Sequence, residues 1–432
     1  MFYALYNILS AFLFIPVCIY HLYRSVSRGR PAAFRERFGH VSSGELAKIG
    51  DRPVIWLHAV SVGEAMASRP LLKALRDRYP GHCIVISTTT ETGRGVASGF
   101  PEKDLCVYFP FDFLPAVQRT LDAIRPDVVI IMETEIWPNF SREAKRRGCP
   151  LILANGRISD RSFGRYLRFR WFFSHALEQF SALCVQTDTD RERICAVGAP
   201  PERTLTGGNL KYDIPYRPIP EEEKAALRER YAIPGRLTVL TAGSTHPGEE
   251  EPVLAAYQEL SAARPSLFLV LAPRHPERTG EVAALLEKAG LPFCRRTALT
   301  DAGTAPFTEG QVLLVDTIGE LMDLYALSDL VFVGGSLVPT GGHNLLEPAS
   351  VGVPSIFGPH MTNFREIAGL VLRYEAGIQV DGAAGLVAAC RGLIDDIGQR
   401  RLLGRNGLRM MEENGGATER HMEVIAKYMQ HG

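Results

Sequence analysis

The sequence predicts two doubly wound α/β domains, each built around a parallel β-sheet that is buried on both faces. Short, continuously apolar runs recur along the chain with amphipathic stretches between them, which is the pattern of parallel strands covered by helices on both sides. A stretch containing several glycines and prolines, residues 207–220, divides these runs into two series. The length of 432 residues also exceeds that of one ordinary domain.

The first series lies within residues 25–212, which we assign to the first domain. Strands are predicted at Val54–Ala59, Cys83–Thr88, Leu105–Phe109, Val128–Met132, Leu151–Ala154 and Leu183–Gln186. Helices are predicted between them, at Glu64–Tyr79, Pro115–Ile124 and Asn139–Arg147.

The second series lies within residues 213–432, which we assign to the second domain. Strands are predicted at Thr238–Ala242, Leu267–Ala272, Val312–Val315, Leu330–Val333, Pro354–Phe357 and Ile378–Val380. This domain is expected to end in one long helix near Arg401–Met429. Because ligands of such sheets bind beyond the carboxyl ends of the strands, we expect both domains to contribute to one site.

Residues 1–24 are predicted to form a membrane-anchor helix. Residues Phe2–Tyr23 contain no Asp, Glu, Lys or Arg, and five arginines follow at positions 24, 28, 30, 35 and 37. An apolar helix of about 20 residues can span a bilayer, and a basic flank after it indicates that the remaining chain is cytoplasmic. The alternative is a helix that lies on the membrane or packs on the protein surface.

The composition excludes several classes of protein. Hydrophobic residues make up 46% and charged residues 22%, which is typical of a globular protein and not of a disordered chain or a polytopic membrane protein. With 48 basic and 48 acidic side chains the formal net charge is zero, so nucleic acid is not an expected partner. The eight cysteines include no CxxC pair, which argues against a zinc ribbon.

Ionisable side chains near predicted strand ends are the candidates for catalysis in the first domain. Glu64 follows the first strand and lies in the first turn of a helix, where it could act as a general base or only cap the helix. Glu133 and Glu135 both follow the fourth strand, and a structural role would need only one capping acid. Lys211, at the domain junction, could face the ligand site or solvent.

Glycine-rich turns follow several predicted strands of the second domain. Such turns bind phosphate through free backbone N–H groups at helix N-termini, and Arg274 could add a bidentate contact. In the densest turn, Asn344 and Glu347 are three positions apart and are expected on one helix face. His246 and His275 lack the spacing of metal ligands, so no metal site is predicted.

Together these segments resemble the 3-deoxy-D-manno-octulosonic acid (Kdo) transferases of Gram-negative lipopolysaccharide assembly. The matching motifs are HAVSVGE (58–64), ETEIWPN (133–139), GNLKYD (208–213), PRHPER (273–278), DTIGEL (316–321) and GGHNLLEP (341–348). The resemblance implies a GT-B glycosyltransferase fold, with the acceptor on the first domain and the nucleotide sugar on the second. It implies CMP-Kdo as donor, lipid IVA (the lipid A precursor) as acceptor, no cofactor, and the cytoplasmic face of the inner membrane as location.

The resemblance also implies roles for individual residues in an inverting, single-displacement transfer. Glu64 would take the proton of the acceptor hydroxyl, and Glu133 and Lys211 would stabilise the transition state. The nucleotide would contact Pro273, Arg274, Ile318, Gly319, Glu320, Asn344, Leu345, Leu346 and Glu347. A second set of arginines suits a bisphosphorylated lipid, or else forms a solvated helix face; these are Arg157, Arg161, Arg165, Arg168 and Arg170.

Two other functions remain open from the sequence. The architecture alone also fits another membrane-associated GT-B transferase with a different nucleotide sugar. A non-catalytic, membrane-anchored protein that binds anionic lipid would need the first helix and the arginines, but it would not explain the acids, the lysine and the glycine turns.

Overall fold

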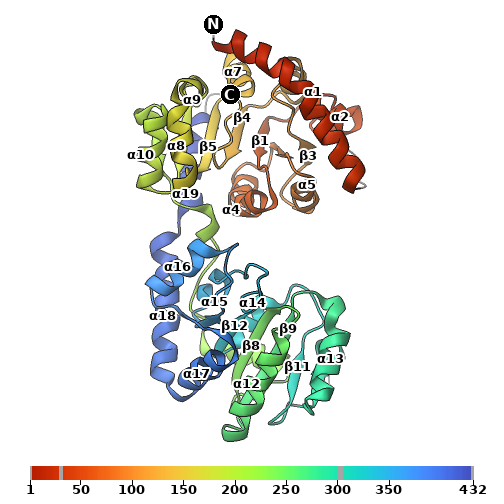
Figure 1. The fold of residues 1–432 in the computed structure, drawn as a ribbon, viewed down its shortest axis with the longest axis vertical. Helices are drawn as coiled ribbons and strands as arrows, with labels where there is room; N and C mark the ends of the chain where they lie inside the picture. Colours follow the sequence, from red (N-terminus) through yellow and green to blue (C-terminus); the bar gives the residue numbers. More distant parts are fainter. Residues whose placement is uncertain (1, 29–32, 300–304, 430–432) are drawn as a thin grey trace. The chain divides into compact units, whose positions relative to one another are not determined.

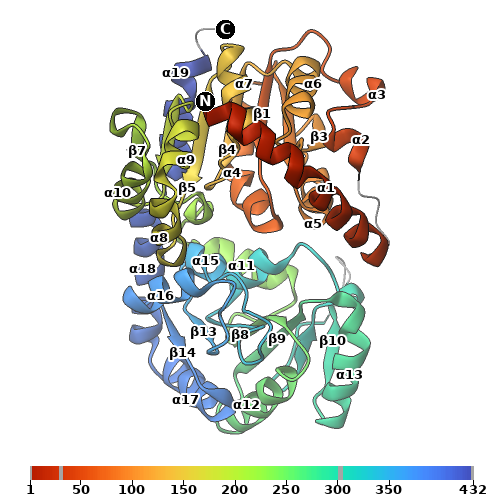
Figure 2. The same cartoon turned by 45° about the horizontal axis from the view of Figure 1, so that its top comes forward.

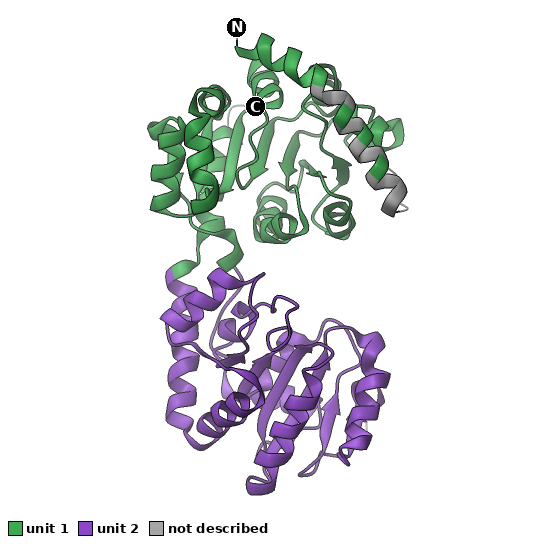
Figure 3. Ribbon diagram, in the orientation of Figure 1, with its two compact units in different colours: residues 1–213, 414–432 green, residues 214–413 purple. Residues whose placement is uncertain are grey.

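The computed structural model describes residues 2–28, 33–299 and 305–429, which form two compact units (Figures 1 and 3). Unit 1 comprises residues 1–213 and 414–432, and unit 2 comprises residues 214–413. Within the described residues, each unit contains one seven-stranded parallel sheet with helices on both faces. The prediction of two parallel-sheet α/β domains is therefore confirmed.

The sheet of unit 1 has the strand order β3-β2-β1-β4-β5-β6-β7. Its strands are β1 (Val54–His58), β2 (Cys83–Thr88), β3 (Leu105–Tyr108), β4 (Val128–Met132), β5 (Leu151–Gly156), β6 (Ala182–Val185) and β7 (Thr204–Thr206). Its helices are α1 (Phe2–Arg28), α2 (Phe34–Arg37), α3 (Ser43–Leu46), α4 (Val62–Arg78), α5 (Glu91–Ser98), α6 (Leu114–Ile124), α7 (Pro138–Arg146), α8 (Asp160–Arg168), α9 (Arg170–Leu177), α10 (Asp188–Val197) and α19 (Ala417–Met429).

The sheet of unit 2 has the order β10-β11-β9-β8-β12-β13-β14. Its strands are β8 (Thr238–Thr245), β9 (Leu267–Pro273), β10 (Phe293–Arg295), β11 (Val312–Leu314), β12 (Leu330–Val333), β13 (Ser355–Phe357) and β14 (Gly377–Gln379). Its helices are α11 (Glu221–Arg230), α12 (Glu250–Ala263), α13 (Thr279–Lys288), α14 (Leu321–Leu327), α15 (Leu346–Ser350), α16 (Arg365–Arg373), α17 (Gly382–Asp395) and α18 (Ile397–Asn414).

Burial on both faces explains why the apolar runs form strands. Every residue of β1, β2, β4 and β5 is buried. Along β1, Trp56 enters the hydrophobic cluster on one face of the sheet, and its neighbours Ile55 and Leu57 enter the cluster on the other. A polar side chain at any of these three positions would lie in an apolar core, so the middle of β1 is continuously apolar.

Helix α1 packs on unit 1, and this differs from the prediction of an anchor that is separate from the domain. The Tyr6 hydroxyl donates to Asp112 Oδ2 at 2.7 Å, and Asn139 Nδ2 donates to Asn7 Oδ1 at 2.8 Å. The Phe2 ring packs on aromatic rings of α9, and the first turns of α1 lie along the outside of unit 1 near α7 (Figure 2). Among the described residues, no helix has the length and apolarity needed to cross a membrane.

The basic flank after α1 is not simply a free charged surface. Arg37 is 3% exposed, and its guanidinium donates to Thr89 O at 2.6 Å and lies 4.3 Å from the centre of the Tyr108 ring. Arg37 therefore holds the segment after α1 against the sheet edge and does not reach solvent. Of the other predicted arginines, Arg30 lies outside the described residues, as do the side chains of Arg24 and Arg28.

The end of the chain also differs from the prediction of one long helix in the second domain. Helices α18 and α19 are separate, because Gly416 adopts a left-handed φ of 76° between them. Helix α19 belongs to unit 1 (Figure 3), where Ala417 and Ile425 are fully buried in the cluster that also contains side chains of α4. The apolar face of α19 thus completes the core of unit 1.

Candidate active site

The carboxyl edge of the unit 1 sheet brings the predicted acids of the first domain together. Strands β1 and β4 are neighbours, although β2 and β3 come between them in the sequence. Glu64 follows β1 and Glu133 follows β4, so both lie where the strand order reverses. This reversal point is where doubly wound sheets bind their ligands.

Glu64 is held at the start of α4 by three short-range hydrogen bonds. Its Oε2 accepts the Val60 N–H at 2.8 Å, its Oε1 accepts the Ser61 hydroxyl at 3.0 Å, and its own N–H donates to Ser61 Oγ at 3.3 Å. This arrangement resembles a capping box, except that Glu64 accepts the N–H of Val60, the residue before the N-cap Ser61, and not that of Ser61 itself. The side chain is nonetheless only 8% exposed, and burial raises the pKa of Glu64 to about 7. Glu64 therefore combines a capping role with the pKa of a general base that works near neutral pH.

Glu133 and Lys211 form an ion pair beside Glu64. Lys211 Nζ lies 3.5 Å from Glu133 Oε1, and both side chains are partly exposed. The two charges act on Glu64 in opposite directions: the negative charge of Glu133 raises its pKa and the positive charge of Lys211 lowers it. The three residues predicted as catalytic are thus brought together within unit 1.

A third carboxylate, Glu135, was noted in the sequence but not assigned a role. Burial raises its pKa to about 7, and the negative charges of Glu64 and Glu133 add to this effect. Glu64 and Glu135 therefore interact beside the negative charge of Glu133, and protonation of Glu64 or of Glu135 favours ionisation of the other.

Asn155, which sequence reasoning missed, connects the cluster to the Lys211 segment. Its Oδ1 accepts the Leu210 N–H at 3.0 Å, and its own N–H donates to His421 Nε2 of α19 at 3.0 Å. Asn155 is fully buried and has a φ of 59°, while Glu133 at the end of the neighbouring strand has a φ of 55°. Such left-handed conformations are unfavourable for residues other than glycine and concentrate at functional sites.

In unit 2 the predicted donor residue Arg274 and two histidines that were not predicted as donor contacts follow strands at the point where the strand order reverses. Arg274 follows β9, His246 follows β8, and the loop that contains His343 follows β12; β8 lies between β9 and β12. His246 Nε2 and His343 Nε2 are 2.9 Å apart. Arg274 is exposed, and in the described part of the chain its guanidinium has no ion-pair partner.

The glycine-rich turn is organised by Glu249, a residue that the sequence did not single out. Glu249 is fully buried. Its two carboxylate oxygens accept the backbone N–H groups of Gly335, Ser336 and Leu337 at 2.6–2.9 Å, and that of His246 at 3.0 Å. The expectation that this turn binds phosphate through free N–H groups is therefore wrong for these three positions, because the protein's own carboxylate occupies them.

The other residues predicted to contact the nucleotide differ in their burial and in their hydrogen-bond partners. Asn344 lies just before α15 and not on it, and its Oδ1 accepts the Leu346 N–H at 3.1 Å. Burial raises the pKa of Glu347. Ile318 is 85% exposed, whereas Glu320 accepts hydrogen bonds from Arg296 and Tyr231. The remaining predicted residues are set out along these loops: Pro273 ends β9, Gly319 has a φ of 94°, and Leu345 is fully buried.

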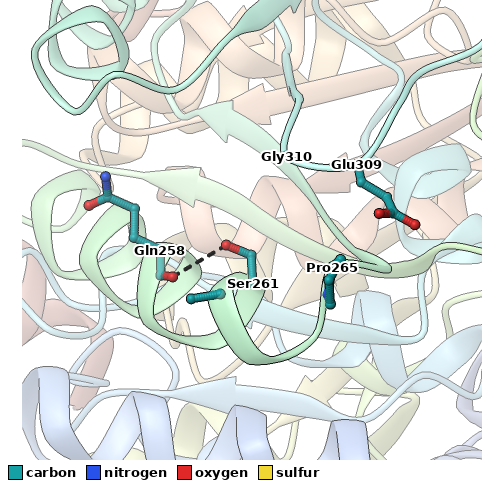
Figure 4. Close-up of a pocket in the computed structure, with 6 residues that line it drawn as sticks. Gln258, Ser261, Pro265, Glu309 and Gly310 are labelled. Carbon is teal, nitrogen blue, oxygen red and sulfur yellow. Dashed lines mark hydrogen bonds between the residues drawn. The ribbon is translucent and has the colours of Figure 1, made fainter.

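One pocket of unit 2 lies away from this edge. It is lined by residues at the end of α12 and by residues just before β9 and β11 (Figure 4); these are Gln258, Ser261, Ala262, Pro265, Glu309 and Gly310. These residues lie near the amino ends of the strands, whereas Arg274, His246 and His343 follow the carboxyl ends. The pocket is therefore separate from the candidate donor site.

Two doubly wound domains, with acids at one reversal point and basic side chains at the other, define a glycosyltransferase-like protein of the GT-B type. A family model for 3-deoxy-D-manno-octulosonic acid transferases matches residues 32–214. A 3-deoxy-D-manno-octulosonic acid transferase of Haemophilus influenzae is 35% identical over 378 residues, which cover 87% of each chain. This chain therefore belongs to the Kdo transferase family and is a glycosyltransferase.

Comparison with solved structures adds two findings. The C-terminal CMP-Kdo binding domain of WaaA from Acinetobacter baumannii is 32% identical, covers 44% of this chain and 96% of that chain, and has a TM-score of 0.40. A UDP-GlcNAc 2-epimerase from Neisseria meningitidis, bound to UDP-GlcNAc, is 12% identical, covers 87% of this chain and 100% of that chain, and has a TM-score of 0.54. The second likeness shows the shared fold alone.

Proposed function

We propose that this protein transfers Kdo from CMP-Kdo to lipid IVA, with inversion at the anomeric carbon, on the cytoplasmic face of the inner membrane. The observation that carries the proposal is the cluster of Glu64, Glu133 and Lys211 at the reversal point of unit 1, in a chain that belongs to the Kdo transferase family. The choice of donor and acceptor rests on the motifs that contain these residues.

Glu64 is the proposed general base. It accepts the proton of the lipid hydroxyl while the hydroxyl oxygen forms a bond to the anomeric carbon of Kdo. The bond from that carbon to the phosphate oxygen breaks, and its electron pair leaves with CMP. A pKa of about 7 makes Glu64 basic enough to accept the proton and leaves a substantial fraction ionised at neutral pH. Lys211 and Glu133 set the electrostatic potential around the reacting oxygen.

The surface of unit 1 supports contact with a membrane. One face of α1 carries exposed apolar side chains at helical spacing, namely Leu5, Ile8, Leu9, Phe12, Ile19 and Tyr23. Exposed Leu167, Phe169 and Trp171 lie beside exposed arginines of α8 and α9, and the Trp171 ring contacts Phe2 of α1. A helix with one docked face and one apolar face suits a position in the membrane interface, where arginines meet anionic headgroups.

The membrane proposal is tested with a double variant that keeps α1 docked. Leu9→Gln with Phe12→Gln changes only exposed side chains of α1, so melting temperature should stay within a degree or two. Binding to vesicles that contain anionic lipid should fall several-fold in a sedimentation assay. The matched control is Leu372→Gln with Leu402→Gln, two exposed leucines of unit 2. Equal vesicle binding by both double variants and the unchanged protein would contradict the proposal.

The chemistry is tested by mass spectrometry of the product formed from lipid IVA and a supply of CMP-Kdo. The unchanged protein should add Kdo, and Glu64→Gln should lower turnover by roughly 10²–10⁴-fold with little change in CMP affinity. Glu222→Gln is the control, because Glu222 is also a first-turn glutamate but is exposed in unit 2. Near-normal turnover of Glu64→Gln would show that this residue only caps α4.

The donor site has its own test. Arg274→Ala and Glu347→Ala should each weaken CMP binding by roughly tenfold to a hundredfold in calorimetry, since each removes a charged hydrogen-bond partner. Competition between CMP and UMP then separates a CMP-sugar enzyme from a related transferase that uses a UDP-sugar. We further propose that the reaction needs no metal, so that EDTA should leave turnover unchanged.

A further inference from the structure

The backbone N–H of Asn155 is bound by a side chain from a distant helix. The pairing of β5 with β6 is irregular between Leu153 and Gly156, and Asn155 lies within this stretch with a φ of 59°. Asn155 is fully buried, so its N–H group needs an acceptor within the protein. That acceptor is His421 Nε2 of α19, which lies 3.0 Å away and 266 residues further along the chain.

Both ring nitrogens of His421 have one assigned role. Nδ1 lies 2.7 Å from the carbonyl oxygen of Ala417, and because a carbonyl only accepts, Nδ1 carries the proton. Nε2 is then a lone pair, as the Asn155 N–H requires. The ring is 1% exposed, and burial lowers the pKa of His421. The positive charge of Arg420 adds to this effect, whereas Ala417 and Asp213 oppose it. His421 is therefore a neutral acceptor fixed in one tautomer.

The segment before Lys211 has two glycines at which α19 packs directly on the backbone. A Cβ atom at Gly207 would lie 2.7 Å from Cε1 of the His421 ring. A Cβ atom at Gly208, whose φ is 84°, would lie 2.5 Å from the guanidinium of Arg420. Arg420 Nε also donates to the Gly207 carbonyl at 2.9 Å. His421 and Arg420 therefore fix the backbone of this segment.

These contacts lead to Lys211. Asn155 Oδ1 accepts the Leu210 N–H at 3.0 Å, so the position of Asn155 sets that of the residue before Lys211. Lys211 Nζ lies 3.5 Å from Glu133 Oε1, and its positive charge lowers the pKa of Glu64. A shift of the Asn155 backbone would therefore reach the ion pair and the charge beside Glu64.

We propose that His421 and Arg420 are positioning residues that hold Lys211 in place for the transfer. His421 acts through the backbone of Asn155, and Arg420 acts through that of Gly207. The proposal deepens the proposed function, and it rests on that function for the role of Lys211 in the reaction. Loss of either contact should lower turnover by moving Lys211, and it should leave nucleotide binding unchanged.

Two substitutions of His421 separate its two hydrogen bonds. His421→Gln can place its amide oxygen where Nε2 lies, so the Asn155 N–H keeps an acceptor. His421→Asn is shorter, so its amide can donate to Ala417 as Nδ1 does, but the Asn155 N–H loses its acceptor. Turnover should fall tenfold or more in His421→Asn with CMP affinity unchanged, and His421→Gln should regain most of this loss. Glu423→Gln, exposed on the same helix, is the control and should keep full turnover. Equal turnover of the two His421 variants would overturn the role of His421.

A pH profile and a double-mutant cycle show whether the effect passes through Lys211. With Lys211 displaced, its charge no longer lowers the pKa of Glu64, so the rise of turnover with pH should move to higher pH in His421→Asn. In a Lys211→Met background, His421→Asn should have little further effect on turnover. A residue with a merely structural role would leave the profile in place and lower turnover by the same factor in both backgrounds. That result would overturn the proposal.

Lysine labelling with acetic anhydride reads the position of Lys211 without the reaction. Loss of the ion pair with Glu133 should make Lys211 several-fold more reactive in His421→Asn but not in His421→Gln, as measured by peptide mass spectrometry. Lys73, exposed on α4, is the internal control and should react equally in all variants. Arg420→Met changes an exposed side chain and should have the same effect as His421→Asn, so it keeps the test available if the His421 variants do not fold.

The labelling also separates this proposal from the proposed function. If the unchanged protein transfers no Kdo but Lys211 still becomes more reactive in His421→Asn, the proposed function fails and the hold of α19 on Lys211 stands. If Lys211 reacts alike in His421→Asn, Arg420→Met and the unchanged protein, the positioning role is overturned.

Discussion

Glu133, directly after β4, and Asn155, near the end of the neighbouring strand β5, have the same left-handed backbone conformation, with φ angles of 55° and 59°. The Glu133 N–H donates to the carbonyl of Ala154, the residue before Asn155. Asn155 Oδ1 in turn accepts a hydrogen bond from the N–H of Leu210. The next residue, Lys211, forms an ion pair with Glu133 through its Nζ. These contacts therefore connect the Glu133, Asn155 and Lys211 segments of the candidate site in a closed ring.

Asn155→Gly should lower turnover while it changes the stability of the protein little. Glycine adopts a positive φ without strain, so the substitution removes strain while it also removes the hydrogen bond to Leu210. We expect a melting temperature within a few degrees of that of the unchanged protein, with turnover lowered roughly tenfold or more as Lys211 loses its position.

The control for this variant is Arg125→Gly. Arg125 has a φ of 49° and is exposed at the end of α6, so it tests relief of the same strain away from the site. Its turnover should be unchanged. If Asn155→Gly also keeps full turnover, the hydrogen bond to Leu210 does not matter for catalysis.

The pH profile of turnover should respond in opposite directions to loss of Glu133 and loss of Lys211. The base must be ionised, so activity should rise with pH and level off above about 7. Glu133→Gln removes a charge that raises the pKa of Glu64, so the rise should move to lower pH. Lys211→Met removes a charge that lowers it, so the rise should move to higher pH. Profiles that both move in one direction would contradict Glu64 as the titrating group.

Glu135→Gln should become more stabilising as the pH rises. Burial raises the pKa of Glu135 in the folded protein to about 7 from its ordinary value of 4.5. Below pH 4.5 the carboxyl is protonated in both the folded and the unfolded state. As the pH rises from there to 7 the unfolded state loses its proton first, and stability falls. The variant has no such loss, so its advantage over the unchanged protein should grow by on the order of 2 kcal/mol between pH 4.5 and pH 8.

Thermal unfolding at the two pH values measures this difference. Glu102→Gln serves as a control, because Glu102 is a partly buried glutamate of unit 1 outside the cluster. A constant difference between Glu135→Gln and the unchanged protein across this range would mean that the pKa of Glu135 is the same in the folded and the unfolded state.

Tyr6→Phe tests whether α1 stabilises unit 1. Asp112 accepts the Tyr6 hydroxyl and also the N–H groups of Asn139 and Phe140. The variant removes one of these three donors, so unfolding should become easier by about 1 kcal/mol, a shift of a few degrees in melting temperature. Tyr216→Phe, at an exposed tyrosine of unit 2, is the control. Equal melting temperatures would mean that α1 does not contribute to the stability of unit 1.

The sequence predicts well those elements whose burial is uniform along the chain. Strands β1, β2 and β4 were predicted almost to the residue, because both of their faces are apolar. Strands β7 and β10 were missed, because two of the three residues of β7 are exposed and β10 is at most partly buried, so neither has a continuously apolar sequence. An amphipathic pattern identifies a helix but not the core it enters, and the contacts of α1 and α19 could not be derived from it.

The candidate site, too, could be predicted only in part from the sequence. Glu64, Glu133 and Lys211 stand beside strand ends or glycines and could be selected from the sequence. Asn155 and Glu249 could not, because their roles depend on hydrogen bonds to segments more than 50 residues away. The occupied N–H groups of the glycine turn likewise depend on one buried carboxylate that no local pattern reveals.

The position of α19 has a consequence for how the protein is made. Asp213, the last residue of the first part of unit 1, accepts the N–H groups of Ala417 and Thr418 at the start of α19. Unit 2 is therefore an insertion between two parts of unit 1. During synthesis on the ribosome, unit 2 can fold as soon as it emerges, whereas unit 1 must wait for residues 417–429. Until then the Asn155 N–H lacks its acceptor, His421 Nε2, and the newly made chain has unit 2 before unit 1 is complete.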